Sequence, residues 1–143
     1  MFVVKLMNDV LIDTNVLIYA IDADSLFHDR CKRFLDKYSS NLFTSSKNLS
    51  EFLSVTTKGN EPKLAHRDAV STVENFLIRM KILYPNAISF EIFLELMRKY
   101  KPKGLKIHDL EIASIAIANQ VNVLASINTK DFAKIKEIKL ADV

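Results

Sequence analysis

The segment of residues 10–20 constrains the fold most, because a single acidic residue separates two apolar runs. Residues 10–12 are Val-Leu-Ile, Asp13 follows, and Thr14 and Asn15 lead into the second run. This order predicts a buried strand that ends in a carboxylate and passes directly into a helix. Ligands of open α/β sheets bind at the carboxyl ends of the strands. An acidic strand end without glycines favours a bound cation over a bound phosphate.

Short apolar runs alternate with longer amphipathic segments along the rest of the chain. The pattern predicts a three-layer α/β fold, in which a short parallel sheet of four or five strands is flanked by helices. The predicted strands are residues 9–13, 42–44, 82–84, 122–126 and 138–140. The predicted helices include residues 14–20, 27–38, 65–80, 90–100 and 109–119, with Ser89 capping the fourth and Asp109 opening the fifth. No repeat or linker interrupts this order, so we predict a single domain over residues 1–143.

The composition is that of an ordinary globular protein, with 49% hydrophobic and 26% charged residues. No apolar run approaches the roughly 20 residues that span a bilayer. The apolar stretch within residues 1–9 is too short for a signal peptide. The single cysteine, Cys31, excludes an internal disulfide framework and a cysteine-based zinc site. We therefore predict a cytoplasmic protein without a membrane segment.

Glycine is scarce, and this excludes two common nucleotide-binding classes. Gly59 and Gly104 are the only glycines. A P-loop and a dinucleotide-binding fingerprint both need clustered glycines that let the backbone approach phosphate closely. The net charge of +3 is mild and permits a polyanionic partner without requiring one.

Four acidic residues stand at or beside the predicted element boundaries: Asp13, Glu51, Asp109 and Asp131. Each has a structural alternative. The three aspartates can cap or stabilise helix N-termini, and Glu51 lies opposite the apolar stripe of its helix, where a solvated side chain is the default.

Taken together, the acids indicate a metal site. Carboxylates gathered on one sheet edge raise one another's pKa unless a cation lies among them. Oxygen ligands suit Mg²⁺ or Mn²⁺, which favour phosphate substrates. The histidines His28, His66 and His108 have no partner at ligand spacing, which argues against zinc.

The chain resembles the PIN domain family, and in particular the VapC-type ribonuclease toxins of prokaryotic toxin–antitoxin pairs. The resemblance rests on four motifs in family order: Asp13-Thr14-Asn15, Ser50-Glu51-Phe52, residues 108–113 (HDLEIA) and residues 126–132 (SINTKDF). Each motif is short, but the resemblance covers essentially the whole chain, with the motifs in family order. The resemblance implies a parallel sheet flanked by helices and a metal-dependent endoribonuclease site.

The resemblance also assigns roles to residues. Asp13 and Asp109 match direct ligands of Mg²⁺ or Mn²⁺, and Glu51 and Asp131 match residues that hold the metal or its waters. The polar residues that orient these acids correspond to Thr14, Asn15, Ser126 and Asn128, with Ser126 where the family often has Thr. The implied partners are an RNA substrate, an antitoxin that grips the helices at residues 65–80 and 90–100, and a second copy of the chain in a homodimer. Glu111 is an additional acid near the site without an assigned role.

A basic stretch precedes Asp109 and includes Lys99, Lys101, Lys103 and Lys106. These lysines can bind RNA phosphates, or they can form a solvated helix end that suits the helix dipole.

The leading hypothesis is a metal-dependent endoribonuclease that acts as a toxin. The alternatives are an RNA-processing nuclease of the same fold outside any toxin–antitoxin pair and a catalytically silent interaction protein. A phospho-accepting receiver domain would need an acid at the end of its third strand, and residues 82–85 (ILYP) supply none.

Overall fold

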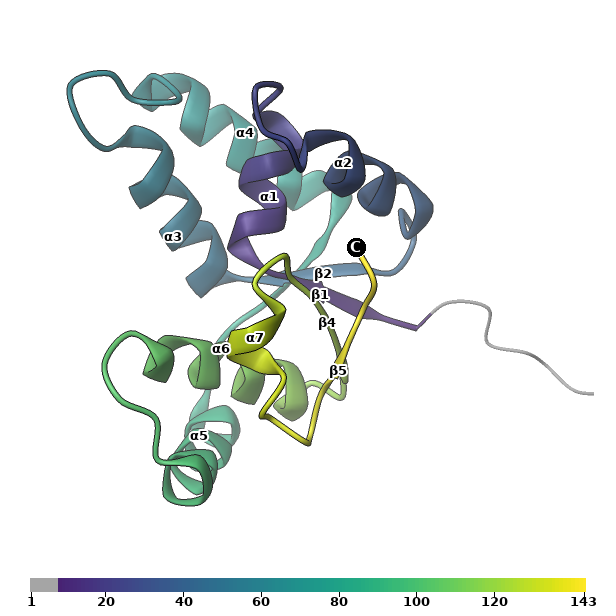
Figure 1. Ribbon diagram of the computed structural model, residues 1–143, viewed down its shortest axis with the longest axis vertical. Coiled ribbons are helices and arrows are strands. Elements are labelled where there is room, and N and C mark those ends of the chain that lie inside the picture. Colours follow the sequence, from purple (N-terminus) through teal and green to yellow (C-terminus); the bar gives the residue numbers. More distant parts are fainter. Residues whose placement is uncertain (1–7) are drawn as a thin grey trace, which may run out of the picture.

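The computed structural model describes residues 8–143 and has a five-stranded parallel sheet at its centre (Figure 1). The strand order is β3-β2-β1-β4-β5, and every neighbouring pair is parallel. The strands are β1 (Val10–Ile12), β2 (Leu42–Ser45), β3 (Lys81–Leu83), β4 (Val123–Ala125) and β5 (Lys139–Leu140). The predicted short parallel sheet is confirmed, with β1 at its centre.

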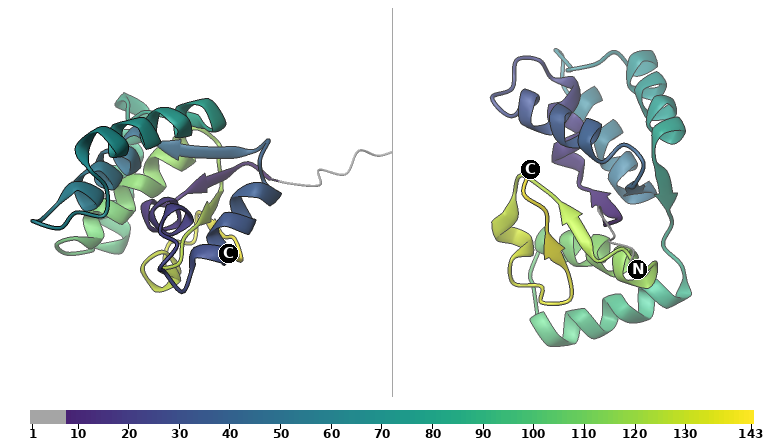
Figure 2. Two further views of the ribbon diagram at one scale, coloured as in Figure 1. Left: turned by 90° about the horizontal axis from the view of Figure 1, so that it is seen from above. Right: turned by 90° about the vertical axis from the view of Figure 1, so that its right-hand side faces the viewer.

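Helices cover both faces of the sheet, which gives the predicted three layers (Figures 1 and 2). One layer contains α1 (Thr14–Ile21), α2 (His28–Lys37), α3 (Ser46–Thr57) and α4 (His66–Arg79). The other contains α5 (Ala87–Tyr100) and α6 (Lys106–Ala118), and the short α7 (Thr129–Phe132) follows β4.

The alternation of side chains along β1 explains why both faces need cover. Val10 and Ile12 belong to the core on the side of α1–α4, whereas Leu11 belongs to the core beneath α5 and α6. All three residues are at most 1% exposed. A strand buried on both faces reads as a continuous apolar run, as in parallel sheets generally.

Two helix starts differ from the sequence-based prediction. α5 begins at Ala87, because Asn86 accepts a hydrogen bond from the Ser89 backbone N–H while the Ser89 hydroxyl accepts one from the Asn86 N–H. Ser89 is thus the third helical residue of a capping box, and the prediction that it precedes the helix was wrong.

The second difference concerns Asp109. The prediction that it opens its helix was wrong, because α6 starts three residues earlier at Lys106. Gly104 has a φ of +62°, which lets the chain turn tightly just before the helix. Asp109 therefore lies within the first turn of α6, where the helix dipole favours a negative charge.

No helix between residues 8 and 143 combines the length and the apolar character that crossing a bilayer requires. The prediction that residues 1–9 are not a signal peptide concerns mostly residues 1–7, which lie outside the described part of the chain.

Candidate metal-dependent nuclease site

Asp13 follows β1 at the carboxyl edge of the sheet, and two distant elements hold its carboxylate. The Ser126 hydroxyl, just beyond β4, donates to Oδ2 at 2.7 Å, and Asn48 Nδ2 from α3 donates to Oδ1 at 3.3 Å. Asp13 is 8% exposed. It occupies the N-cap position of α1 without a side-chain capping bond, so helix capping does not account for its placement.

Asn48 is a positioning residue that the sequence analysis missed. It is fully buried, and besides Asp13 its amide nitrogen donates to Thr14 Oγ1 at 3.1 Å. The hydroxyl of Ser45, the N-cap of α3, donates to Asn48 Oδ1 at 2.5 Å. An asparagine three residues after a serine cap, on the same face of the helix as Leu49 and Phe52, was the available signal.

The predicted supporting residues form one hydrogen-bond network that connects Asp13 with Asp131. Asn15 donates to Ser126 Oγ at 3.1 Å and accepts from the Ile127 backbone N–H at 3.2 Å. Ser126 Oγ also accepts from the Asn128 backbone N–H at 3.1 Å, and the Asn128 side chain donates to Asp131 Oδ2. The carboxyl end of β4 therefore orients both aspartates at once.

The other acids meet beside this network. Glu51 from α3, Asp109 from α6 and Asp131 from α7 line one cavity of about 400 Å³, together with Lys106 and His108. Glu51 reaches it from the exposed face of α3, opposite the buried Phe52. Thus residues that are widely separated in the sequence converge on this cavity, which we call the acidic notch. It lies at the carboxyl edge of the sheet, where open α/β sheets bind ligands.

The electrostatics show how closely these acids interact. Partial burial, followed by the charges of Asp13, Asp131 and Glu51, raises the pKa of Asp109 to about 6. Burial likewise raises the pKa of Asp13, and the charges of Glu51 and Asp131 add to this increase. The hydrogen bond from Ser126 lowers the pKa but offsets the increase only in part. Negative charges that raise the pKa of a neighbouring carboxyl in this way are stabilised by a cation among them.

The donor set fits a hard divalent cation. All four candidate ligands are carboxylates, and Mg²⁺ binds through one or two protein carboxylates while it keeps several waters. As the side chains lie, residues 8–143 contain no group of three acidic, histidine or cysteine side chains that could hold a metal ion. The arrangement thus suits an ion bound by few direct protein ligands and its own waters, rather than a closed protein cage.

Glu111 has a structural role as one partner of an ion pair. Its carboxylate lies 3.1 Å from the Lys47 ammonium group, and both side chains are about one-third exposed. The pair connects α3, which carries Glu51, with α6, which carries Asp109. It therefore bridges the two helices that flank the notch.

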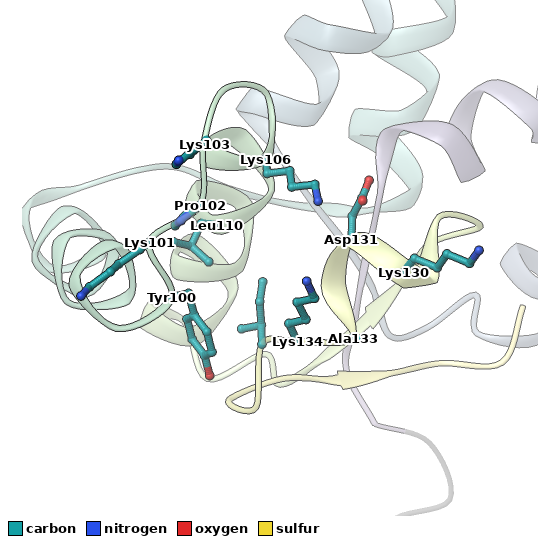
Figure 3. A pocket seen from close by; sticks show the side chains of 11 residues that line it. Tyr100, Lys101, Pro102, Lys103, Lys106, Leu110, Lys130, Asp131, Ala133 and Lys134 are labelled. Atoms are coloured by element: carbon teal, nitrogen blue, oxygen red, sulfur yellow. The ribbon is translucent and has the colours of Figure 1, made fainter.

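The lysines of the basic stretch lie beside the acids. Lys101, Lys103 and Lys106 line a second cavity of about 880 Å³, which also includes Asp131 (Figure 3). Lys99 does not line it, because its ammonium group is bound to Glu137 at 2.7 Å.

Replacement of Ser126 tests whether the network positions Asp13. In Ser126→Ala, Asp13 loses its shortest hydrogen bond, and we expect metal affinity to fall about 10- to 100-fold, as for other residues that orient a metal ligand. Calorimetric titration with Mn²⁺ measures this effect. Ser126→Thr keeps the hydroxyl and should retain affinity near that of the unchanged protein, whereas equal affinity in all three proteins would contradict the positioning role.

Comparison with known proteins agrees with this architecture. The family model of the PIN domain matches residues 10–138. VapBC2 from Rickettsia felis, bound to a promoter DNA fragment, is 26% identical over 92% of this chain and 96% of that chain, with a TM-score of 0.73. DNA-bound VapBC from Salmonella typhimurium is 25% identical over 95% and 98% of the two chains, with a TM-score of 0.72.

A third structure shares the fold at lower identity. VapC20 from Mycobacterium tuberculosis, described as a sarcin-ricin loop cleaving toxin, is 15% identical over 87% of this chain and 93% of that chain, with a TM-score of 0.71. A search of curated proteins found no match. Because the family model spans nearly the whole chain and the three-layer parallel sheet agrees with it, this chain belongs to the PIN domain family.

Proposed function

We propose that this protein is a Mg²⁺- or Mn²⁺-dependent endoribonuclease that hydrolyses RNA phosphodiester bonds. The observation that carries the proposal is the convergence of Asp13, Glu51, Asp109 and Asp131, whose charges act on one another at the carboxyl edge of the sheet. Membership of the PIN domain family supports a nuclease.

In this proposal Asp13 and Asp109 hold the divalent cation, and Glu51 and Asp131 hold it or its waters. When held by these residues, a divalent cation would supply Lewis acidity toward a water ligand and positive charge beside the phosphate. Ser126 and Asn48 fix the carboxylate of Asp13, so that this ligand needs no reorganisation on metal binding. Thr14, Asn15 and Asn128 complete the support.

We assign the binding of RNA phosphates to the basic stretch, through Lys101, Lys103 and Lys106. Lys106 lines the acidic notch as well as the larger cavity, and its charge lowers the pKa of Asp109 against the larger upward effects. Cations beside the notch offset the repulsion between the carboxylates and the RNA backbone. Lys99 contributes less, since Glu137 neutralises it.

We further propose that the protein is the toxin of a toxin–antitoxin pair and acts in the cytoplasm. The support is its likeness to VapBC complexes from Rickettsia felis and Salmonella typhimurium. An antitoxin needs accessible apolar surface, and α4 and α5 expose Ile78 (84%), Ile88 (62%) and Phe90 (58%). We expect a homodimer, which light scattering of the purified protein tests directly.

The proposed activity is tested by incubating end-labelled RNA with the purified protein in Mg²⁺, in Mn²⁺ and in EDTA. Internal cleavage products that appear with either metal and disappear with EDTA support the proposal. Absence of cleavage of any RNA in a total cellular pool with either metal would favour a catalytically silent interaction protein instead.

A further inference from the structure

We propose that the 880 Å³ cavity beside the acids is a two-walled groove for the backbone of single-stranded RNA, with Lys130 and Lys134 supplying the second wall. This inference rests on the proposed function and extends it, because neither lysine belongs to the basic stretch of residues 98–106. It assigns the path of the substrate away from the cleavage site.

The two walls come from separate parts of the chain (Figure 3). The turn between α5 and α6 contributes Lys101 and Lys103, and the first residue of α6 contributes Lys106. α7 and the residues after it contribute Lys130 and Lys134. Figure 3 shows the ammonium groups of Lys106 and Lys134 directed into the space between the walls, whereas those of Lys101, Lys103 and Lys130 point away from it.

The charge of the groove is available to a ligand. Within residues 8–143, none of these five lysines has a carboxylate within ion-pair distance, whereas Lys47, Lys63 and Lys99 each have one. Among the described residues that line the groove, Asp131, at the junction with the notch, is the only acid. A concave surface with one sign of charge concentrates a polyanion and speeds its association.

The groove continues directly into the acidic notch. Lys106 and Asp131 line both cavities. A strand with its scissile phosphate at the carboxylates can therefore place the neighbouring phosphates between the lysines. This continuity favours a nucleic-acid strand over a small anion, which would occupy only one of the two cavities.

A fixed contact at the base holds the walls together. The Tyr100 hydroxyl donates to Glu137 Oε1 at 2.5 Å and accepts from the Lys136 backbone N–H at 2.9 Å. Lys99 donates to Glu137 Oε2 at 2.7 Å. The end of α5 is thus bound to the segment that follows α7, so the separation of the walls is set before RNA arrives, which lowers the cost of binding.

The test measures binding in EDTA, where cleavage does not interfere. Fluorescence anisotropy of a labelled oligouridine measures its affinity for three proteins. These are the unchanged protein, the groove variant Lys106→Ala/Lys134→Ala, and the charge-matched control Lys32→Ala/Lys58→Ala, whose lysines are exposed elsewhere on the surface. We expect the groove variant to bind about tenfold more weakly. Its slope of log K against log salt should be shallower by about 1.4, which corresponds to two lost phosphate contacts on a single strand. The control should match the unchanged protein, and thermal unfolding checks that all three are folded.

Equal affinity and equal salt slopes in the groove variant and the control would overturn the groove. Competition by duplex DNA as effective as that by unlabelled RNA would overturn the assignment to single-stranded RNA. These results are separate from failure of the nuclease, in which the unchanged protein would bind oligouridine through the groove and cleave no RNA with Mg²⁺ or Mn²⁺.

Discussion

Asp13→Asn is expected to reduce metal-dependent RNA cleavage by about 1000-fold, equivalent to roughly 4 kcal/mol of transition-state stabilisation. The carboxylate lies at the centre of the site, and Ser126 and Asn48 hold it in place. An asparagine has nearly the same shape, so the fold and the neighbouring packing remain, although its amide nitrogen replaces one of the two oxygens that accept from Ser126 and Asn48. What it lacks is the negative charge with which Asp13 is proposed to hold the divalent cation. Initial rates of cleavage of a labelled RNA, at saturating Mg²⁺, measure the loss.

The matched control is Asp24→Asn, which removes the same charge from an exposed turn between α1 and α2. It should cleave RNA at the rate of the unchanged protein. Rates within about threefold of one another for Asp13→Asn and Asp24→Asn would show that Asp13 is not a metal ligand of the reaction, since loss of one such ligand costs far more.

Asp109→Asn is expected to separate stability from activity. Activity should fall about 100- to 1000-fold, because Asp109 is the second proposed direct ligand. The metal-free protein should nevertheless become more stable at pH 8, by about 1 kcal/mol. This figure is discounted from the full effect of the pKa shift, because the side chain is about half exposed to solvent screening.

The sign follows from the pKa of Asp109, which is about 6 in the folded protein against an ordinary value of 3.8. The folded state therefore binds this proton more tightly than the unfolded state does. Its contribution to stability is greatest below pH 3.8, decreases as the pH rises through about 6, and is absent at pH 8. Asparagine carries no charge, so the variant escapes this loss.

Thermal unfolding in EDTA at pH 5 and pH 8 measures the effect. We expect the melting temperature of Asp109→Asn to exceed that of the unchanged protein by about 3 °C at pH 8 and by less at pH 5. Asp68→Asn, which alters an exposed first-turn acid of α4, should be slightly less stable than the unchanged protein because it loses a favourable interaction with the helix dipole. A lower melting temperature for Asp109→Asn than for Asp68→Asn at pH 8 would contradict the account.

Much of the fold could be predicted because its pattern is local. The continuous apolar run of β1, buried on both faces, and the all-round apolar α6 are each recognisable within a short window. Their alternation is enough to predict a parallel sheet with two helical layers. Helix starts were less predictable, because the Asn86–Ser89 capping box and the turn at Gly104 depend on backbone geometry that residue types only partly specify.

The candidate acids could be chosen from the sequence, but their arrangement in space could not. Sequence order alone places Asp13 after one strand and Asp131 after another, and parallel pairing brings these strand ends to the same edge. The buried hydrogen bond of Asn48 to Asp13 spans 35 positions, and the second lysine wall comes from a separate turn of the chain. Such contacts depend on how α3 and α7 pack against the sheet, which no local pattern encodes.

The most direct test of a divalent cation among these carboxylates is anomalous diffraction from crystals soaked in Mn²⁺ at a pH above the Asp109 pKa of about 6. We expect a manganese peak between the carboxylates of Asp13 and Asp109 that is absent in crystals of Asp13→Asn. A soaked crystal with manganese bound only elsewhere, or with a peak that persists unchanged in Asp13→Asn, would contradict it.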